Sequence, residues 1–178
     1  ELKRLEEKQI GISRLEQVRD IFLFCCLTGL AYVDVASLNM ENIVEGKRGR
    51  QWLRKARNKT NNMCNIPLLR PALRILEKYA EYRTATGRLL PVPSNQKMNA
   101  YLKELATLCG VTKNLTTHCA RHTFATTVTL ANGASLENVS KMLGHSSVRM
   151  TQHYAKILNS SIERDMDKIE SELIGEDE

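Results

Sequence analysis

The chain has 178 residues, of which 42% are hydrophobic and 26% are charged, and its formal net charge is +6. This length is typical of one compact domain, and the composition is typical of a folded protein rather than a disordered or fibrous one. No run of about 18 apolar residues indicates a transmembrane helix, and no secretory start is found. The five cysteines are an odd number without Cys-x-x-Cys spacing, so we expect reduced thiols in a cytoplasmic protein.

The charge is distributed unevenly along the chain. Residues 160–178 contain eight acidic and two basic residues, a net charge of −6, so residues 1–159 carry +12. The segment 47–59 contains seven basic residues and no acidic one. Such a positive field favours a polyanionic partner, most simply nucleic acid, although a solvated basic hairpin would have the same composition.

The N-terminal half is predicted to combine helices with one small sheet. Residues 1–12 are expected to be a linker or the start of a first helix. Apolar residues at three- and four-residue steps predict a helix over residues 13–28, with Gly29 as its stop. A short helix follows near residues 32–38. Between residues 42 and 68, short β-type runs separated by glycines and asparagines predict an antiparallel sheet of two or three strands.

The C-terminal half is predicted to be helical. Apolar spacing, a first-turn proline, serine caps and glycine stops mark the helix boundaries. The predicted helices cover residues 71–83, 98–108, 117–131, 136–143, 147–158 and 161–174. We therefore expect a single domain over residues 1–178 that is mainly α-helical with a small antiparallel β-sheet, an α+β fold. The last, acidic helix carries an apolar stripe that must pack on its own domain or on a neighbouring subunit.

One polar cluster lies at the start of the predicted helix 117–131. His118 and Arg121 are three residues apart and share a helix face, and a helix start offers free N–H groups and positive potential that suit a phosphate. His118 and His122 have the spacing of zinc proteases, but Cys119 stands where those enzymes have glutamate, and no clear carboxylate ligand follows. We therefore predict no metal site, and we expect His122 to face inward and to be hydrogen-bonded.

A second polar cluster is Leu143-Gly144-His145, followed nine residues later by Tyr154. By itself, Tyr154 indicates only packing on a helix, and the two helices flanking Gly144 would also fit a helix-turn-helix that reads a major groove. Lys59 lies in the predicted tip of the basic hairpin, where a lysine is normally just solvated.

Together these segments resemble the catalytic domain of the tyrosine recombinase/integrase family, the phage integrase family, including integrases of bacterial mobile elements. The resemblance covers residues 13–158, with each motif in the family's order and spacing. The motifs are Thr28-Gly29-Leu30, Lys59 in a β-hairpin, His118-x-x-Arg121, Leu143-Gly144-His145 and Tyr154.

The resemblance implies a site-specific recombinase that breaks and rejoins DNA strands through a covalent 3′-phosphotyrosine, without a metal or any other cofactor. Tyr154 would be the nucleophile, and Lys59 the general acid for the departing 5′ oxygen. The guanidinium of Arg121 would bind two phosphate oxygens. His118 and His145 would add hydrogen bonds, and either would help to take the phenol proton.

One position departs from the family pattern. The family has an arginine directly after Thr-Gly-Leu, but this chain has Ala31, which cannot neutralise a phosphate. Arg57 is the first candidate replacement, because extended backbone there would put Arg57 and Lys59 on one face. A turn that begins at Asn58 would remove that argument, and Arg54 is the next candidate. The basic residues expected to contact DNA are Arg48, Arg50, Arg54 and Lys55.

The implied partner is double-stranded DNA at the bacterial nucleoid, with no membrane and no small-molecule substrate. The resemblance also implies a homotetramer on DNA that exchanges a C-terminal helix, and an N-terminal DNA-clamping domain outside these residues. Two other functions fit the residues. One is a catalytically impaired or non-catalytic DNA-binding module, which Ala31 favours. The other is a histidine-dependent phosphodiesterase in which Tyr154 is incidental.

Overall fold

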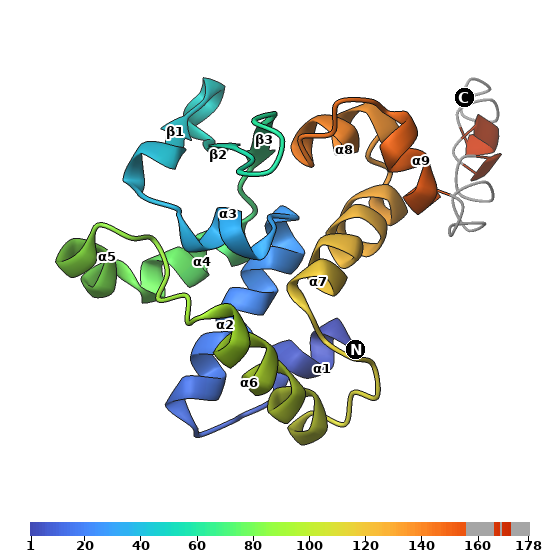
Figure 1. The fold of residues 1–178 in the computed structure, drawn as a ribbon. Helices are drawn as coiled ribbons and strands as arrows, with labels where there is room; N and C mark the ends of the chain where they lie inside the picture. The colour runs from blue at the N-terminus through green and yellow to red at the C-terminus, as the bar shows by residue number, and fades with distance from the viewer. Residues whose placement is uncertain (156–165, 168, 172–178) are drawn as a thin grey trace.

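A computed structural model describes residues 1–155, 166, 167 and 169–171. These residues form a mainly helical body with one small sheet (Figure 1), which confirms the predicted fold class. The helices are α1 (Leu2–Glu7), α2 (Ser13–Thr28), α3 (Tyr32–Ala36), α4 (Arg70–Lys78), α5 (Ala80–Thr86), α6 (Asn95–Leu108), α7 (Thr117–Thr123), α8 (Leu136–Met142) and α9 (Arg149–Ala155). The strands are β1 (Ile43–Glu45), β2 (Gln51–Ala56) and β3 (Met63–Pro67). Short turns of other helix types are η1 (Met40–Asn42), η2 (Lys47–Gly49), η3 (Phe124–Thr129) and η4 (Leu130–Asn132).

Helix α2 is the central element, and its bounds agree with the predicted helix 13–28. It packs against α4, α6 and α7, and almost all of its second half is buried. The helix ends because Gly29 adopts a left-handed conformation (φ 68°) and donates its N–H to the carbonyl of Cys25 (2.8 Å). A Cβ at Gly29 would lie 2.5 Å from the ring of Phe124, so glycine also permits this close approach.

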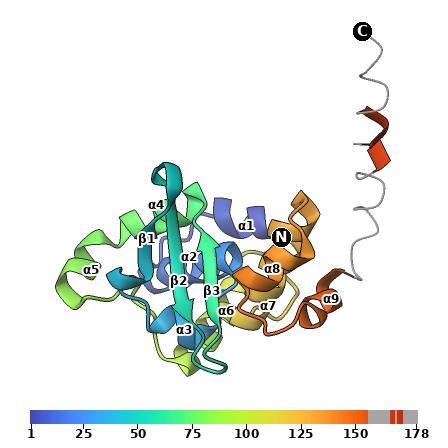
Figure 2. The same cartoon turned by 90° about the horizontal axis from the view of Figure 1, so that it is seen from above.

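The sheet has three antiparallel strands in the order β1-β2-β3, as predicted for residues 42–68. Leu53 pairs with Ile66, and both are buried on the face that covers the core. Strand side chains alternate, so Trp52 and Asn65 lie on the outer face. Strand β3 runs beside α8 (Figure 2), and this contact brings the sheet close to Gly144.

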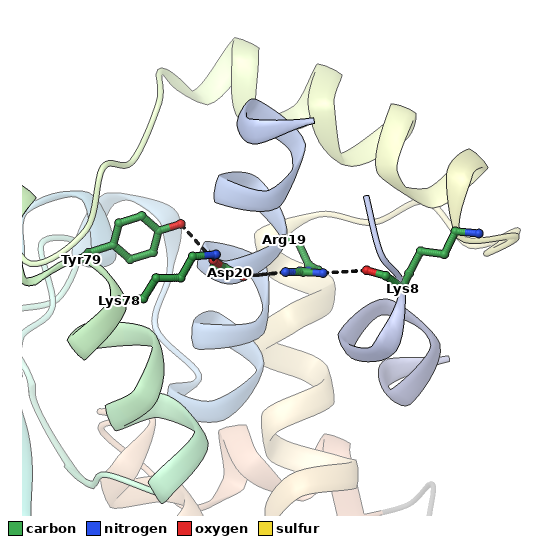
Figure 3. A network of polar contacts seen from close by, with 5 residues as sticks. All are labelled: Lys8, Arg19, Asp20, Lys78 and Tyr79. Atoms are coloured by element: carbon green, nitrogen blue, oxygen red, sulfur yellow. Dashed lines mark hydrogen bonds and ion pairs between the residues drawn. The ribbon is translucent and has the colours of Figure 1, made fainter. Parts of the chain in front are cut away.

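A buried carboxylate joins α2 to α4. Asp20 is 5% exposed and accepts hydrogen bonds from Lys78 Nζ (2.6 Å) and from the Tyr79 hydroxyl (2.9 Å), as Figure 3 shows. Burial, followed by the charge of Asp20, raises the pKa of Tyr79. The prediction of one helix over residues 71–83 is wrong at this point. The helix breaks at Tyr79 (φ −103°, ψ 24°), where the side chain turns to Asp20, and α5 begins after it.

The predicted helix 117–131 exists, but its winding changes within the run. Helix α7 ends at Thr123, and residues 124–129 form a π-helical turn. The hydroxyl of Thr129 lies within hydrogen-bond distance of the carbonyls of Phe124 (2.9 Å) and Ala125 (2.8 Å), so its one proton is shared between them. Sequence periodicity does not separate these windings, because all of them keep a similar face buried.

The C-terminal predictions are only partly covered. Helix α9 confirms a helix after Ser147, whose hydroxyl accepts from the N–H of Arg149 (3.2 Å). Its predicted extension to residue 158 lies outside the described residues. Of the predicted helix 161–174, residues 166, 167 and 169–171 are described and are helical and exposed. The remainder of that helix also lies outside the described residues.

Candidate active site

Arg121 of α7 lies where the C-terminal ends of α2 and α8 meet α7, and the polar side chains around it are called the pocket of the candidate site. The hydroxyl of Thr116 caps α7 by accepting from the N–H of Cys119 (3.1 Å), which confirms the predicted helix start. Arg121 is 5% exposed, and it donates from Nη1 to the carbonyl of Gly29 (2.6 Å) and from Nη2 to that of Leu143 (2.7 Å). These carbonyls orient the guanidinium without cancelling its charge. No ion pair to Arg121 exists among the described residues.

His145 is held between Arg121 and Thr151. Its Nε2 lies 3.1 Å from Nη2 of Arg121, and its Nδ1 lies 2.8 Å from the hydroxyl of Thr151. Because a guanidinium only donates, Nε2 is the acceptor, and the ring proton resides on Nδ1. Burial, followed by the charges of Arg121 and Arg57, lowers the pKa of His145 to about 4. The imidazole is therefore neutral at pH 7.

Tyr154 lies among three imidazole rings. Tyr154 is 8% exposed, and its ring is nearly parallel to that of His145, with centroids 6.4 Å apart and an interplanar angle of 7°. The ring of His122 meets it edge-on at 5.3 Å, and that of His153 at 5.9 Å. Arg121 and Tyr154 both lie beside His145, which joins the guanidinium to the phenol. The structure therefore brings together Arg121, His145 and Tyr154.

Arg57 packs over Gly144 at the edge of this pocket. Gly144 has a φ of 61°, and a Cβ there would lie 2.8 Å from Cys64 Sγ and 2.9 Å from Arg57 Cδ. The Nε of Arg57 is buried and has no hydrogen-bond partner among the residues that the structure describes. Burial first, and then the charge of Arg57, lowers the pKa of Arg121. Two guanidinium groups thus lie close together, and neither forms an ion pair with a residue that the structure describes.

The prediction that Arg57 and Lys59 lie on one face of an extended strand is nevertheless wrong. Strand β2 ends at Ala56, and a turn begins at Asn58, so Arg57 and Lys59 do not share the face of an extended strand. Arg57 instead lies at the site because β3 packs against α8, and because Gly144 has no side chain that would collide with Arg57. Ala31 contributes only backbone: its carbonyl accepts from the N–H of Asp34 and caps α3.

Asp34 is a buried residue that sequence reasoning missed. It is 1% exposed, and its Oδ1 accepts from the backbone N–H of Asn58 (2.9 Å). The amide of Asn58 in turn donates to the carbonyl of Val33 (3.3 Å). Asp34 therefore fixes the turn that follows Arg57 and carries Lys59. The available signal was an aspartate on the short helix, between apolar positions, three residues after Ala31.

Lys59, His118 and His122 are less closely tied to the pocket. Lys59 lies in the exposed β2–β3 turn, and His118 is exposed in the first turn of α7. Neither side chain makes a hydrogen bond or ion pair within the described part of the chain. His122 faces inward as expected, but its ring contacts Tyr154 and has no hydrogen bond to a described residue, so that half of the expectation is wrong.

The predicted DNA-contacting residues divide between the two faces of the sheet. Arg48, Arg50 and Arg54 line a cleft of about 670 Å³ beside the β1–β2 connection. Lys55 pairs with the buried Cys64, which places it on the opposite face from Arg54. Within the described residues, no group of three or more His, Cys, Asp or Glu side chains could hold a metal ion. A membrane-spanning helix is likewise absent from the residues that the structure describes.

Comparison with solved structures defines the class of the fold. XerA recombinase matches with a TM-score of 0.69 and 22% identity, covering 94% of this chain and 62% of that one. XerH site-specific recombinase, in a post-cleavage complex with its difH substrate, matches with a TM-score of 0.71 and 16% identity, covering 95% and 50%. At these identities the likeness establishes the fold, which is that of a tyrosine recombinase catalytic domain.

Sequence comparison establishes the family. The model of the phage integrase family matches residues 13–160, and this chain belongs to that family. Tyrosine recombinase XerD of Corynebacterium glutamicum is 32% identical over 136 residues, which are 75% of this chain and 43% of that protein. Tyrosine recombinase XerA of Pyrococcus furiosus is 29% identical over 173 residues, 89% and 58% respectively. The chain therefore spans about half the length of these relatives, and the family predicted from its motifs is confirmed.

Proposed function

We propose that this chain is the catalytic part of a site-specific DNA recombinase that cuts and rejoins strands through Tyr154. The observation that carries the proposal is the ring of Tyr154 lying against His145, which is itself hydrogen-bonded to Arg121. A potential nucleophile, a neutral imidazole and a cation that forms no ion pair with a described residue thus lie close together. This combination suits attack on a phosphodiester, where negative charge grows on the oxygens during reaction.

In the proposed reaction, Tyr154 Oη attacks the scissile phosphorus while the bond to the 5′ oxygen breaks. The phenol proton passes to a base, and the 5′ oxygen takes a proton from an acid. The products are a 3′-phosphotyrosine and a free 5′-hydroxyl. Attack by a 5′-hydroxyl from another strand then reverses these steps and releases Tyr154. The linkage conserves the bond energy, so the scheme requires no metal, cofactor or external energy source.

Each side chain is assigned one task in this scheme. Arg121 and Arg57 bind the non-bridging oxygens, and Arg57 takes the place that Ala31 leaves empty. When the phosphate replaces His145 Nε2 as the acceptor for Arg121, that nitrogen becomes free to accept the phenol proton. Lys59 is assigned as the acid for the 5′ oxygen by family resemblance, and the anchored turn that carries it supports the assignment.

His118 and the assembly complete the proposal. The exposed position of His118 in the first turn of α7 suits a hydrogen bond to a phosphate oxygen. The partner is duplex DNA, which the net charge of +12 on residues 1–159 favours. We assign a homotetramer that exchanges its C-terminal segments, acting at the bacterial nucleoid in the cytoplasm, by family resemblance.

The test is formation of a covalent adduct on suicide DNA. A pool of labelled, nicked duplexes with randomised sequence around the nick is incubated with the chain, and products are resolved in SDS. The wild type is expected to give an SDS-stable band, and Tyr154→Phe is expected to give none while still binding DNA. A band that survives this substitution would exclude Tyr154 as the nucleophile. Binding without a band in the wild type would favour the second candidate, a non-catalytic DNA-binding module suggested by Ala31.

A further inference from the structure

Two clefts on the outer face of the sheet meet at Trp52 and Asn65. The first, of about 670 Å³, lies over the β1–β2 connection. The second, of about 590 Å³, lies between the sheet and α8 and reaches Gly144 and His145. Trp52 and Asn65 line both clefts, so the two clefts adjoin on the outer face, and together they are called the sheet groove. This sheet groove leads from the basic connection at residues 46–50 to the candidate active site.

The strand register explains which side chains enter the sheet groove. Leu53 and Ile66 are paired and buried against the core, so their neighbours on each strand point outward. Arg54 is paired with Asn65, which places a cation and an amide side by side on the outer face. Trp52 is only partly buried beside them.

The sheet groove is entirely positive in its charged groups. Its charged lining residues are Lys47, Arg48, Arg50 and Arg54 at one end and Lys141 at the other. No acidic side chain lines either cleft within the described residues. Several cations without counter-charges along one track suit a polyanion whose charges repeat, as the phosphates of a nucleic acid strand do.

The amides in the sheet groove suit a different task. Asn65 lies in the part that both clefts share, and Asn138 lies on α8 across from it. An asparagine side chain presents one donor and one acceptor together, the pattern that pairs with the edge of adenine. Phosphate contacts fix the position of DNA without reading it, whereas base-edge contacts read sequence. The cations therefore suit positioning of the DNA backbone, and the amides suit reading of the base sequence.

We propose that the sheet groove holds the DNA flanking the cleavage site, with phosphates on the cationic end and a base edge against Asn65. The inference rests on the proposed function and adds a sequence-reading residue to it. DNA is favoured over an acidic protein segment because the groove opens at His145, where the scissile phosphate of the same duplex would lie.

The first experiment measures the affinity for a random 30-base-pair duplex pool between 50 and 300 mM salt. Arg54→Gln is expected to lower the affinity about three- to tenfold at 100 mM salt and to reduce the slope of log affinity against log salt by about one. Arg74→Gln is the matched control, because Arg74 is exposed on α4 and lines a separate cavity between α1, α2 and α4. Its slope is expected to equal that of the wild type.

A comparison of Arg54 with Lys55 tests which face of the sheet contacts DNA. Lys55 carries the same charge one residue away but lies on the opposite face of the sheet. Lys55→Gln is expected to change the salt slope by less than half as much as Arg54→Gln. Equal effects of the two substitutions, or a wild-type slope for Arg54→Gln, would overturn the proposal. The melting temperature of each variant shows that it is folded.

The second experiment sequences the duplexes that the wild type and Asn65→Ala retain from the same pool. Asn65→Ala is expected to keep the salt slope and to lose about tenfold preference at one base position. Unchanged preference at every position would overturn the assignment of Asn65. Because both experiments measure binding, their failure is distinct from failure of strand cleavage, which the Tyr154 adduct reports. Absence of any DNA binding by the wild type would overturn both proposals.

Discussion

Arg121 donates a hydrogen bond to Nε2 of His145 across 3.1 Å. The other ring nitrogen donates to the hydroxyl of Thr151 at 2.8 Å, so both positions of the imidazole are occupied. The pair therefore presents one cation and one neutral base, rather than two cations that repel each other. A phosphate that replaces His145 as the acceptor would leave Nε2 free, and its negative charge would offset the arginine charges that, after burial, lower the pKa of His145.

The free energy of unfolding should fall in acid because of His145. Its pKa is about 4 in the folded chain, against an ordinary value of 6.5, so the unfolded state binds more protons between these pH values. Stability is therefore complete above about pH 6.5 and is lost as the pH falls towards 4. Urea unfolding at pH 7 and pH 4.5 should show the wild type losing about 2 kcal/mol more than His145→Gln. If the wild type and His145→Gln lose equal unfolding free energy between pH 7 and pH 4.5, the pKa of His145 is not lowered in the folded chain.

Arg57→Ala should slow adduct formation by about 10²- to 10³-fold at saturating DNA, because one of two groups that stabilise the developing charge is removed. The measurement is single-turnover formation of the SDS-stable band on a duplex that the wild type cleaves. Arg57→Lys keeps the charge but loses the planar fork, so its rate should lie between the two.

A modified substrate separates the charge of Arg57 from a general loss of structure. A methylphosphonate at the scissile position lacks one charged oxygen and needs less positive charge for reaction. Arg57→Ala should therefore recover much of its lost rate on this duplex. A wild-type rate for Arg57→Ala on the natural phosphodiester would show that another group replaces the arginine missing at Ala31.

Asp34→Ala should slow adduct formation at least tenfold by releasing the turn after Arg57. The substitution removes the acceptor of the Asn58 N–H, and leaving such a group unpaired costs about 1–3 kcal/mol of stability. Asp34→Asn keeps an oxygen that accepts this bond and should retain most of the rate. Limited proteolysis within residues 58–61 should be faster only in Asp34→Ala. Equal rates in both variants would show that the carboxylate charge, not the anchored turn, is what matters.

Gly144→Ala should reduce adduct formation strongly, because its Cβ would collide with Cys64 Sγ and Arg57 Cδ. Gly87→Ala is the matched control, since Gly87 also has a positive φ (72°) but has no atom within 4 Å of a built Cβ. Both variants carry similar backbone strain of about 1 kcal/mol. If both lose activity equally, the close packing at Gly144 has no specific role.

Local sequence signals predicted the elements but not their breaks. The helix 13–28, its stop at Gly29 and the sheet over residues 42–68 follow from spacing and glycine chemistry, and the structure has them. The break at Tyr79 coincides with a hydrogen bond from its hydroxyl to Asp20, which is 59 residues away along the chain. Such a tertiary contact has no local signature.

In the candidate site, too, some residues have a local sequence signal, whereas others are placed only by tertiary contacts. The resemblance of several short motifs to the tyrosine recombinase family, taken together, identified Arg121, His145 and Tyr154. Asp34 was missed, since its partner is the backbone of a turn whose position only the folded sheet fixes. Arg57 was named for the wrong reason, because the packing of β3 on α8, rather than strand alternation, brings it to the pocket.

The most direct test of the central claim is to map the covalent adduct on the protein. Nuclease trimming and trypsin digestion of the SDS-stable species should leave a nucleotide on the peptide 150–156, which contains Tyr154 as its only tyrosine. Fragmentation in the mass spectrometer should assign the phosphate to Tyr154, and the bond should survive mild acid. An acid-labile phosphate on His153, or a modified residue in any other peptide, would contradict the account.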